Sequence, residues 1–215
     1  MKIDFVSDVA CPWCAVGLNA LEIALKRIGD DIPVSLQMQP YELNPDMAIE
    51  GVDASEYLAR KYGLSAEQLA ANRANIRARG AEVGFSFGDR ARVWNTFDAH
   101  RLLHWAGQHG RQRELKHALL RAYHGEGRNP GAKDVLLALA AEVGLDAEAA
   151  RAVLESDAHA AEVRQAEAFW QQNGISAVPS VIINDRHLIQ GGQPPEVFEQ
   201  AIRQIAASEG STPQA

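Results

Sequence analysis

The sequence predicts an α/β protein whose mixed central sheet is interrupted by a large all-helical insertion. Strand patterns occur near both ends of the chain, and roughly 120 residues between them are almost wholly helical in pattern. Both cysteines of the chain, Cys11 and Cys14, lie directly after the first strand pattern. A length of 215 residues fits one good-sized domain, or a smaller domain that carries an insertion.

The first forty residues have the pattern of a βαβ unit. Residues 3–9 are mostly apolar and predict a buried strand, and a helical apolar pattern follows the cysteines as far as Gly29. Apolar residues then alternate with others over residues 32–39, which predicts a second strand. Two such strands are expected to be parallel, and the crossover between them to be right-handed.

The middle of the chain predicts a set of consecutive helices. After a loop at residues 40–52, Ser65-Ala66-Glu67-Gln68 has the form of a capping box, and Asn129-Pro130 predicts a helix start with proline at the first helical position. An irregular segment is expected at residues 84–93. The predicted helices span residues 65–84, 95–110, 112–124, 132–143, 146–154 and 158–172. No fixed-period repeat indicates a solenoid.

The end of the chain returns to strands. Residues 180–184 and 187–190 predict a hairpin, and an amphipathic helix follows Pro195. The predicted organisation is a first part of the α/β domain with the cysteine pair (1–44), a helical insertion domain (45–172), a second part of the α/β domain (173–208) and a flexible tail (209–215).

The cysteine pair lies where a strand ends and a helix begins. Free N–H groups and the helix dipole at such a place favour a thiolate, so we expect Cys11 to be accessible and acidic and Cys14 to be shielded. Pro12 fits the first helical position. Thiols at this spacing can close into a disulfide, and the first can attack a disulfide in another molecule. A zinc site has the same spacing but needs four ligands, and no second pair at suitable spacing is present, so we expect no metal and no cofactor.

Composition limits the classes of partner. A net charge of −7 argues against a general nucleic-acid binder and against an anionic-membrane binder. No run of about 18 apolar residues is present to span a membrane. Met1 leads directly into the first strand, so we expect no leader segment and a cytoplasmic location. Thiols are mostly reduced in the cytosol, which favours a catalytic pair over a structural disulfide.

Four motifs in this order of elements resemble the DsbA family of thioredoxin-fold oxidoreductases, most closely its FrnE-like branch, over Lys2 to Ala207. They are Ser7-Asp8-Val9-Ala10-Cys11-Pro12-Trp13-Cys14, Asn95-Thr96-Phe97-Asp98-Ala99-His100-Arg101-Leu102, Ser176-Ala177-Val178-Pro179-Ser180 and Gly191-Gly192-Gln193-Pro194-Pro195-Glu196-Val197-Phe198. The resemblance implies a thioredoxin fold. It also implies that Cys11 attacks, that Cys14 resolves, and that a Val178-Pro179 loop with a cis bond faces them.

Other residues near these motifs have less certain roles. Trp13 brings no charge, so the helix terminus is expected to be the main stabiliser of the Cys11 thiolate. Asp8 is either a proton acceptor near Cys14 or a solvated carboxylate at the strand end, and the second interpretation is favoured. Asn95, with Thr96, begins a helix that approaches the active site in this family, but a plain helix cap explains both residues equally well. His100 and His104 share a helix face, where packing is a better explanation than metal binding.

We therefore expect a thiol-disulfide oxidoreductase that acts as a cytosolic disulfide reductase or isomerase. Its expected partners are thiols and disulfides of proteins or small molecules, and glutathione is one candidate. The direction follows from Pro12-Trp13, which offers no cation to stabilise a reduced form deeply. Two alternatives remain open. One is a glutathione-dependent isomerase or transferase related to 2-hydroxychromene-2-carboxylate isomerase, although those proteins have Ser where Cys11 stands. The other is a chaperone-like binding protein, and homodimerisation is also left open.

Overall fold

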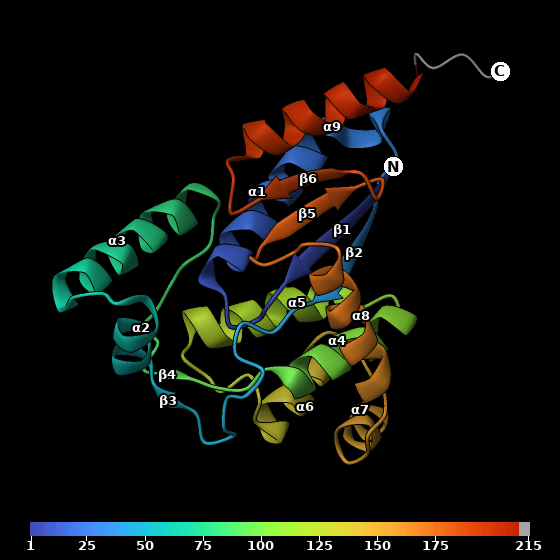
Figure 1. Cartoon of the computed structure of the whole chain (residues 1–215). Helices are drawn as coiled ribbons and strands as arrows, with labels where there is room; N and C mark the ends of the chain where they lie inside the picture. Colours follow the sequence, from blue (N-terminus) through green and yellow to red (C-terminus); the bar gives the residue numbers. More distant parts are fainter. Residues whose placement is uncertain (211–215) are drawn as a thin grey trace.

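A mixed sheet of four strands, in the order β2-β1-β5-β6, forms the centre of the fold (Figure 1). It is seen in a computed structural model that describes residues 1–210. The strands are β1 (Lys2–Ser7), β2 (Ser35–Pro40), β5 (Ser180–Ile183) and β6 (His187–Gln190). β1 is parallel to β2 and antiparallel to β5, and β5 is antiparallel to β6. The predicted mixed α/β sheet is confirmed.

Helices α1 (Pro12–Ile28) and α9 (Pro195–Gly210) lie side by side on one face of this sheet (Figure 1). A short 3₁₀ turn, η1 (Gly29–Asp31), ends α1. Phe5 of the sheet, Leu18 of α1 and Phe198 of α9 are completely buried in one shared core. Burying side chains of this size stabilises the fold by about 1.5–3 kcal/mol each.

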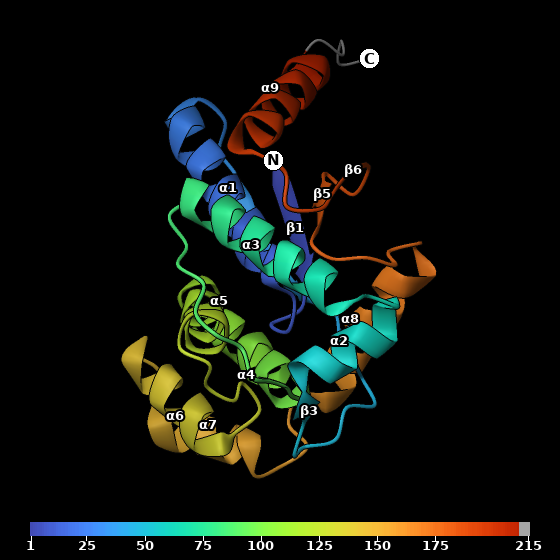
Figure 2. The same ribbon diagram turned by 90° about the vertical axis from the view of Figure 1, so that its left-hand side faces the viewer.

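The chain between β2 and β5 is mainly helical. Its helices are α2 (Ala54–Tyr62), α3 (Ala66–Glu82), α4 (Phe97–Gln108), α5 (Gln112–Leu120), α6 (Lys133–Glu142), α7 (Ala147–Leu154) and α8 (Ala160–Gln172), and a π turn, η2 (Arg121–Gly125), continues α5. Helices α4 to α7 lie below the sheet in Figure 1 around a second apolar core. Helix α3 lies across α1, as Figure 2 shows from the side.

The structure confirms some predicted boundaries and corrects others. The capping box is present, because Ser65 Oγ accepts from the Gln68 amide and the Gln68 side chain accepts from the Ser65 amide. Helix α6 spans Lys133–Glu142, close to the predicted range of 132–143, but its N-cap is Ala132 and not Asn129. The Asn129 side chain accepts from the Gly131 amide instead and closes a local turn. Short-range turn chemistry therefore competed successfully with the predicted helix start.

Two further features differ from the sequence prediction. The chain forms a small second sheet from β3 (Val52–Asp53) and β4 (Arg92–Val93), where only loop was expected. Helix α9 continues to Gly210, and the Glu209 carboxylate accepts hydrogen bonds from the Asn184 amide, so the tail does not begin at Glu209. The rest of the predicted tail, 211–215, lies outside the described residues. Within residues 1–210, no helix has the length and apolar character needed to cross a membrane.

Candidate active site

The cysteine pair lies at the junction between β1 and α1. Cys11 is the N-cap residue of α1, Pro12 opens the helix, and the Cys11 amide donates to the Asp8 carbonyl at 3.2 Å. The two cysteines lie 3.6 Å apart and form no disulfide. Cys14 is fully buried, as expected, but Cys11 is only 4% exposed. The prediction of an accessible Cys11 is therefore wrong for this conformation, because the chain around Val178 covers its sulfur.

The environment shifts the pKa values of the two thiols in opposite directions. The Cys14 thiol hydrogen-bonds to Cys11 and lowers the pKa of Cys11, and the backbone amides of Trp13 and Cys14 in the first turn of α1 lower it further, against burial and the charge of Asp8. Burial, followed by the bond to Cys11, raises the pKa of Cys14 well above its ordinary value. The expected lowering of the pKa of Cys11 is supported, and the hydrogen bond from the Cys14 thiol is its largest single cause.

A loop that precedes β5 faces Cys11. The Val178–Pro179 peptide bond is cis, the isomer that the resemblance implies, and the Cys11 thiol donates to the Val178 carbonyl at 3.4 Å. Gly17 of α1 allows this approach, because a Cβ at that position would lie only 2.9 Å from the Pro179 ring. The ring of Trp13 is partly buried against Gly192 in the same way. The structure thus brings Pro12, Trp13, Val178 and Pro179 together around the cysteines.

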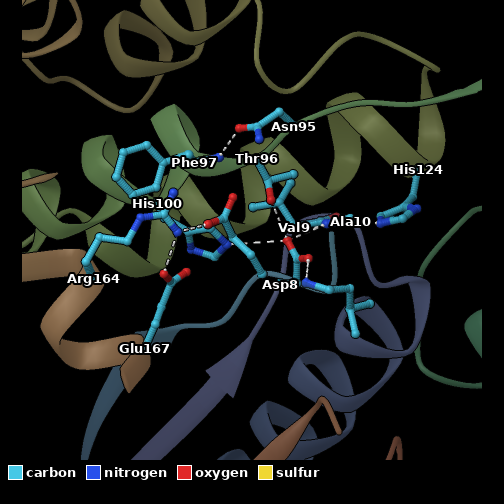
Figure 3. Close-up of polar contacts among 12 residues, drawn as sticks. Asp8, Val9, Ala10, Asn95, Thr96, Phe97, His100, His124, Arg164 and Glu167 are labelled. Atoms are coloured by element: carbon cyan, nitrogen blue, oxygen red, sulfur yellow. Dashed lines mark hydrogen bonds and ion pairs between the residues drawn. The ribbon is translucent and has the colours of Figure 1, made fainter. Parts of the chain in front are cut away.

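Asp8 is the main correction to the predicted site. The interpretation as a solvated carboxylate is wrong, because Asp8 is completely buried. One carboxylate oxygen accepts from the Ala10 amide at 2.9 Å and from the Thr96 hydroxyl at 2.8 Å, and it lies 3.3 Å from His100 Nε2 (Figure 3). The other oxygen accepts from the Leu43 amide at 2.7 Å. Asp8 therefore joins the start of α1 to the start of α4 and to the loop after β2.

These contacts decide the charge of Asp8. Burial alone raises the pKa of Asp8, but the hydrogen bond and charge of His100, with the amides of Ala10 and Leu43, outweigh burial and lower it. A carboxylate of lowered pKa with both oxygens occupied is a poor proton acceptor. The structure favours a positioning role for Asp8 over the proton-accepting role that was the second interpretation.

The side chains of Asn95 and Thr96 point to different parts of the molecule. The side-chain oxygen of Asn95 accepts from the Phe97 backbone amide at 2.8 Å, and its side-chain NH₂ donates to the Met47 carbonyl at 3.2 Å. This side chain therefore faces the loop after β2 and not Cys11. Thr96 makes no side-chain cap bond to α4 and donates to Asp8 instead. His100 packs inside the protein against Asp8, whereas His104 lies against the His159 ring.

Two buried charged features were not anticipated from the sequence. Glu42 and Glu167 both accept from Arg164, whose guanidinium lies 3.7 Å from the centre of the Phe97 ring (Figure 3). Burial raises the pKa of Glu42 to about 7. The second feature is Lys116 in α5, which is 1% exposed. Its place between Leu115 and Leu119 of an apolar helix face was the available signal, since an exposed lysine seldom occurs there.

His124 supports the strand that precedes the cysteines. Its Nε2 lies 2.8 Å from the Val9 carbonyl, and burial lowers the pKa of His124 to about 3. The ring is therefore neutral at ordinary pH, and this nitrogen donates to the carbonyl. His124 thus satisfies a buried carbonyl directly before the active-site turn.

A cavity of about 750 Å³ reaches Cys11 from the side of α2 and α3. Its charged lining residues are Lys61, Arg73, Arg77 and Arg90, with Asp53 and Asp89 of opposite sign. The wall therefore has an excess of positive charge in a chain of net charge −7. Among residues 1–210 no cluster of three His, Cys, Asp or Glu side chains is arranged to hold a metal ion.

A C-x-x-C pair at the start of the first helix of a mixed sheet, with a cis-proline loop against it, defines a thioredoxin-like protein, here with extra helices between its two strand regions. Residues 2–203 match the DSBA-like thioredoxin domain family. The chain belongs to this DsbA-like family of thiol oxidoreductases.

The solved structures that are similar to the chain include the following three. The probable DsbA oxidoreductase SCO1869 from Streptomyces coelicolor is 37% identical, with a TM-score of 0.92 over 100% of this chain and 93% of that one. A 2-hydroxychromene-2-carboxylate isomerase shares the fold at 15% identity, with a TM-score of 0.73 over 98% of each chain. The cytosolic disulfide reductase DsbM from Pseudomonas aeruginosa, solved with GSH, shares it at 19% identity, with a TM-score of 0.67 over 96% of this chain and 100% of that one.

Proposed function

We propose that the protein is a cytosolic disulfide reductase or isomerase that works through a Cys11–Cys14 dithiol-disulfide cycle. The observation that carries this proposal is the opposite shift of two adjacent thiols, with the pKa of Cys11 lowered and that of Cys14 raised. One thiol is thereby prepared to attack while the other stays protonated until it is needed. This division of labour is what a nucleophilic and a resolving cysteine require.

The chemistry proceeds in two exchange steps. The Cys11 thiolate attacks one sulfur of a substrate disulfide, the substrate S–S bond breaks, and the departing thiolate takes a proton from water. Cys14 then loses its proton and attacks the Cys11 sulfur, which releases the second substrate thiolate and forms the Cys11–Cys14 disulfide. Two electrons pass from the dithiol to the substrate, and two molecules of an external thiol return them in the reverse sequence and leave as a disulfide.

The cavity supports a substrate with carboxylate groups. Lys61 from α2 and Arg73 from α3 line it, and within residues 1–210 neither has a carboxylate partner, so both can attract an anion in a partly enclosed space. Arg77 also lines the cavity but is paired with Asp89 at 2.6 Å. A small peptide disulfide such as glutathione disulfide carries carboxylates of the corresponding charge, and a cavity of about 750 Å³ lies within the size range of small-molecule sites. That DsbM is a cytosolic reductase solved with GSH supports the same substrate class and location.

The redox equilibrium with glutathione tests the proposal. Trp13 lies between the two cysteines, so its fluorescence is a direct reporter of their oxidation. A reductase or isomerase is expected to equilibrate in the range of about −180 to −270 mV, whereas a value near −120 mV would indicate a strong oxidase. Cys11→Ser should abolish every exchange reaction. Retained isomerase or transferase turnover in that variant would favour the family of 2-hydroxychromene-2-carboxylate isomerase instead.

A further inference from the structure

Helices α2 and α3, with the turn between them, form an arm of residues 54–82 beside the start of α1 (Figures 1 and 2). The arm lies on the side from which the cavity of about 750 Å³ reaches Cys11. Cys11 is 4% exposed and donates to the Val178 carbonyl, so a substrate disulfide reaches its sulfur through this cavity. The arm therefore stands between Cys11 and a substrate that approaches from this side.

Each helix of the arm turns one face to the cavity. Spacings of three and four residues place side chains on the same face of a helix. The cavity is lined at these spacings by Ala54, Leu58 and Lys61 of α2 and by Leu69, Arg73 and Ile76 of α3. In an ordinary surface helix such a face packs against a core, whereas here both faces border the space that leads to Cys11. The two helices therefore serve as the wall of a cavity.

Hydrogen bonds hold the arm in place at both ends. Lys61 of α2 donates to the Leu43 carbonyl at 3.0 Å and to the Asn44 side-chain oxygen at 2.7 Å, both in the loop after β2. At the far end of α3, Arg79 donates to the Gly192 carbonyl at 3.4 Å. The arm is thus tied to the segments on either side of the cysteine pair, and the wall that it forms is a fixed one.

The space behind this wall suits a small molecule. A volume of about 750 Å³ lies within the range of about 300–1,000 Å³ that small-molecule sites have. In a protein disulfide the chain continues on both sides of each cysteine, so several chain segments would have to cross the rim of the cavity together. A small disulfide has no such continuation and can enter whole. The arm therefore discriminates by size.

Two cations of the wall add discrimination by charge. Arg73 donates to the Ser55 hydroxyl at 2.6 Å, and Lys61 donates to neutral oxygens alone, so within residues 1–210 neither has a carboxylate partner. Arg77, by contrast, is paired with Asp89 at 2.6 Å. Cations without a counter-ion in a partly enclosed space raise the local concentration of anions. A negatively charged substrate is favoured over a neutral or positive one.

We infer that the arm makes this protein a reductase of small, negatively charged disulfides and excludes protein disulfides. The Cys11–Cys14 dithiol passes two electrons to one small disulfide, whose S–S bond breaks, and two small thiols leave with the protons of the dithiol. The inference rests on the proposed function and narrows it to reduction, because an isomerase must admit protein substrates. Arg73 is assigned as a residue that determines specificity for charge.

A series of disulfides tests size and charge separately. The reduced protein is mixed with glutathione disulfide (anionic), hydroxyethyl disulfide (neutral), cystamine (cationic) or insulin, and the change in tryptophan fluorescence gives the rate constant of its oxidation. Each rate is divided by the rate of the same disulfide with dithiothreitol, which removes differences in intrinsic reactivity. Compared with glutathione disulfide, cystamine should react at least about tenfold more slowly. Insulin should react about 10²-fold more slowly or less, because its disulfides are kept out of line with Cys11.

Variants of Arg73 test the charge. Arg73→Met keeps the length of the side chain without its charge, so it should slow the reaction with glutathione disulfide by about tenfold and leave hydroxyethyl disulfide within about twofold. Arg73→Lys keeps the charge and should restore most of the rate. Arg60→Met is the matched control, because Arg60 is exposed on the same arm and does not line the cavity, and it should leave every rate unchanged.

A variant of Arg79 tests the wall. Arg79→Met removes the hydrogen bond to Gly192, and the loss of one such bond shifts an equilibrium between closed and open arm positions by about fivefold. The rate with insulin should rise by about this factor, while the rate with glutathione disulfide stays within about twofold. Glu82→Gln is the control, because it removes the ion pair between Glu82 and Arg79 and leaves the tie to Gly192.

The possible failures are distinguishable. A wild-type protein that reacts with insulin as fast as with glutathione disulfide would overturn the inference and leave the proposed function intact. So would an insulin rate that is unchanged in Arg79→Met, or a rate with glutathione disulfide that is unchanged in Arg73→Met. A wild-type protein that exchanges with none of the disulfides would refute the proposed function itself.

Discussion

Replacing Asp8 by Asn should destabilise the protein strongly, although the two side chains are nearly the same size. The Ala10 and Leu43 amides each have an Asp8 oxygen as their hydrogen-bond acceptor, at 2.9 and 2.7 Å. An Asn side chain has one acceptor oxygen, so whichever way it turns, its NH₂ group faces one of these buried N–H donors. A buried donor left unpaired costs about 1–3 kcal/mol, and the lost charge of Asp8 beside His100 and Thr96 adds to this, so we expect a loss of about 2–5 kcal/mol.

Urea unfolding at pH 7, followed by tryptophan fluorescence, measures this loss. Asp46→Asn, at an exposed position in the loop after β2, is the matched control and should change the free energy of unfolding by less than about 0.5 kcal/mol. If Asp8→Asn stays within about 1 kcal/mol of wild type, the hydrogen bonds of Asp8 do not stabilise the fold as argued here.

The same variant predicts a pH dependence with a definite sign. The pKa of Asp8 is lower in the folded protein than in the unfolded chain, so the unfolded chain binds more protons as the pH falls. The stabilisation by Asp8 is therefore fully present above about pH 4 and is lost as the pH drops through the folded-state pKa. Because Asn does not titrate, the gap between wild type and Asp8→Asn should narrow below about pH 4. A gap that is constant or widens there would contradict the assignment of Asp8 as a buried anion.

Two further variants test other parts of the site. Gly17→Ala places a methyl group 2.9 Å from the Pro179 ring, so it should lower the free energy of unfolding in urea by about 1–3 kcal/mol and slow the attack by Cys11. The control Gly144→Ala lies at a position with a positive φ and no atom within 4 Å, so it should affect stability alone. Glu42→Gln should raise the free energy of unfolding by about 1–2 kcal/mol at pH 8 and leave it unchanged below about pH 4. The pKa of Glu42 is about 7 in the folded protein and lower in the unfolded chain, so wild type loses stability as the pH rises from the unfolded-state pKa through 7, and Gln, which does not ionise, escapes this loss. Equal stability of Glu42→Gln and wild type at pH 8 would show that the carboxyl ionises without penalty.

Local patterns in the sequence were enough to place the helices and strands that carry the cysteines. A strand pattern over residues 3–9, a proline at position 12 and a helical apolar repeat after it put Cys11 at a helix start without any knowledge of the rest of the chain. In the structure the strand itself ends at Ser7. Periodicity and capping depend on neighbours only a few residues away, so they can be recognised before folding is considered. The Val178–Pro179 loop was located through a resemblance, since no local pattern brings it to Cys11.

The buried charged and polar groups near the cysteines are placed by contacts between segments that lie far apart in the sequence. Asp8 and Thr96 are 88 residues apart in the chain, and Asp8 is buried because the start of α4 packs over it. Lys116 is buried only because one face of α5 lies against β2 and α1. Whether a charged side chain faces water or the interior depends on how helices pack and not on its near neighbours in sequence. The sequence alone therefore determined where the two thiols stand, and the tertiary structure decided which buried charges surround them, because burial and pairing set the cost of each charge.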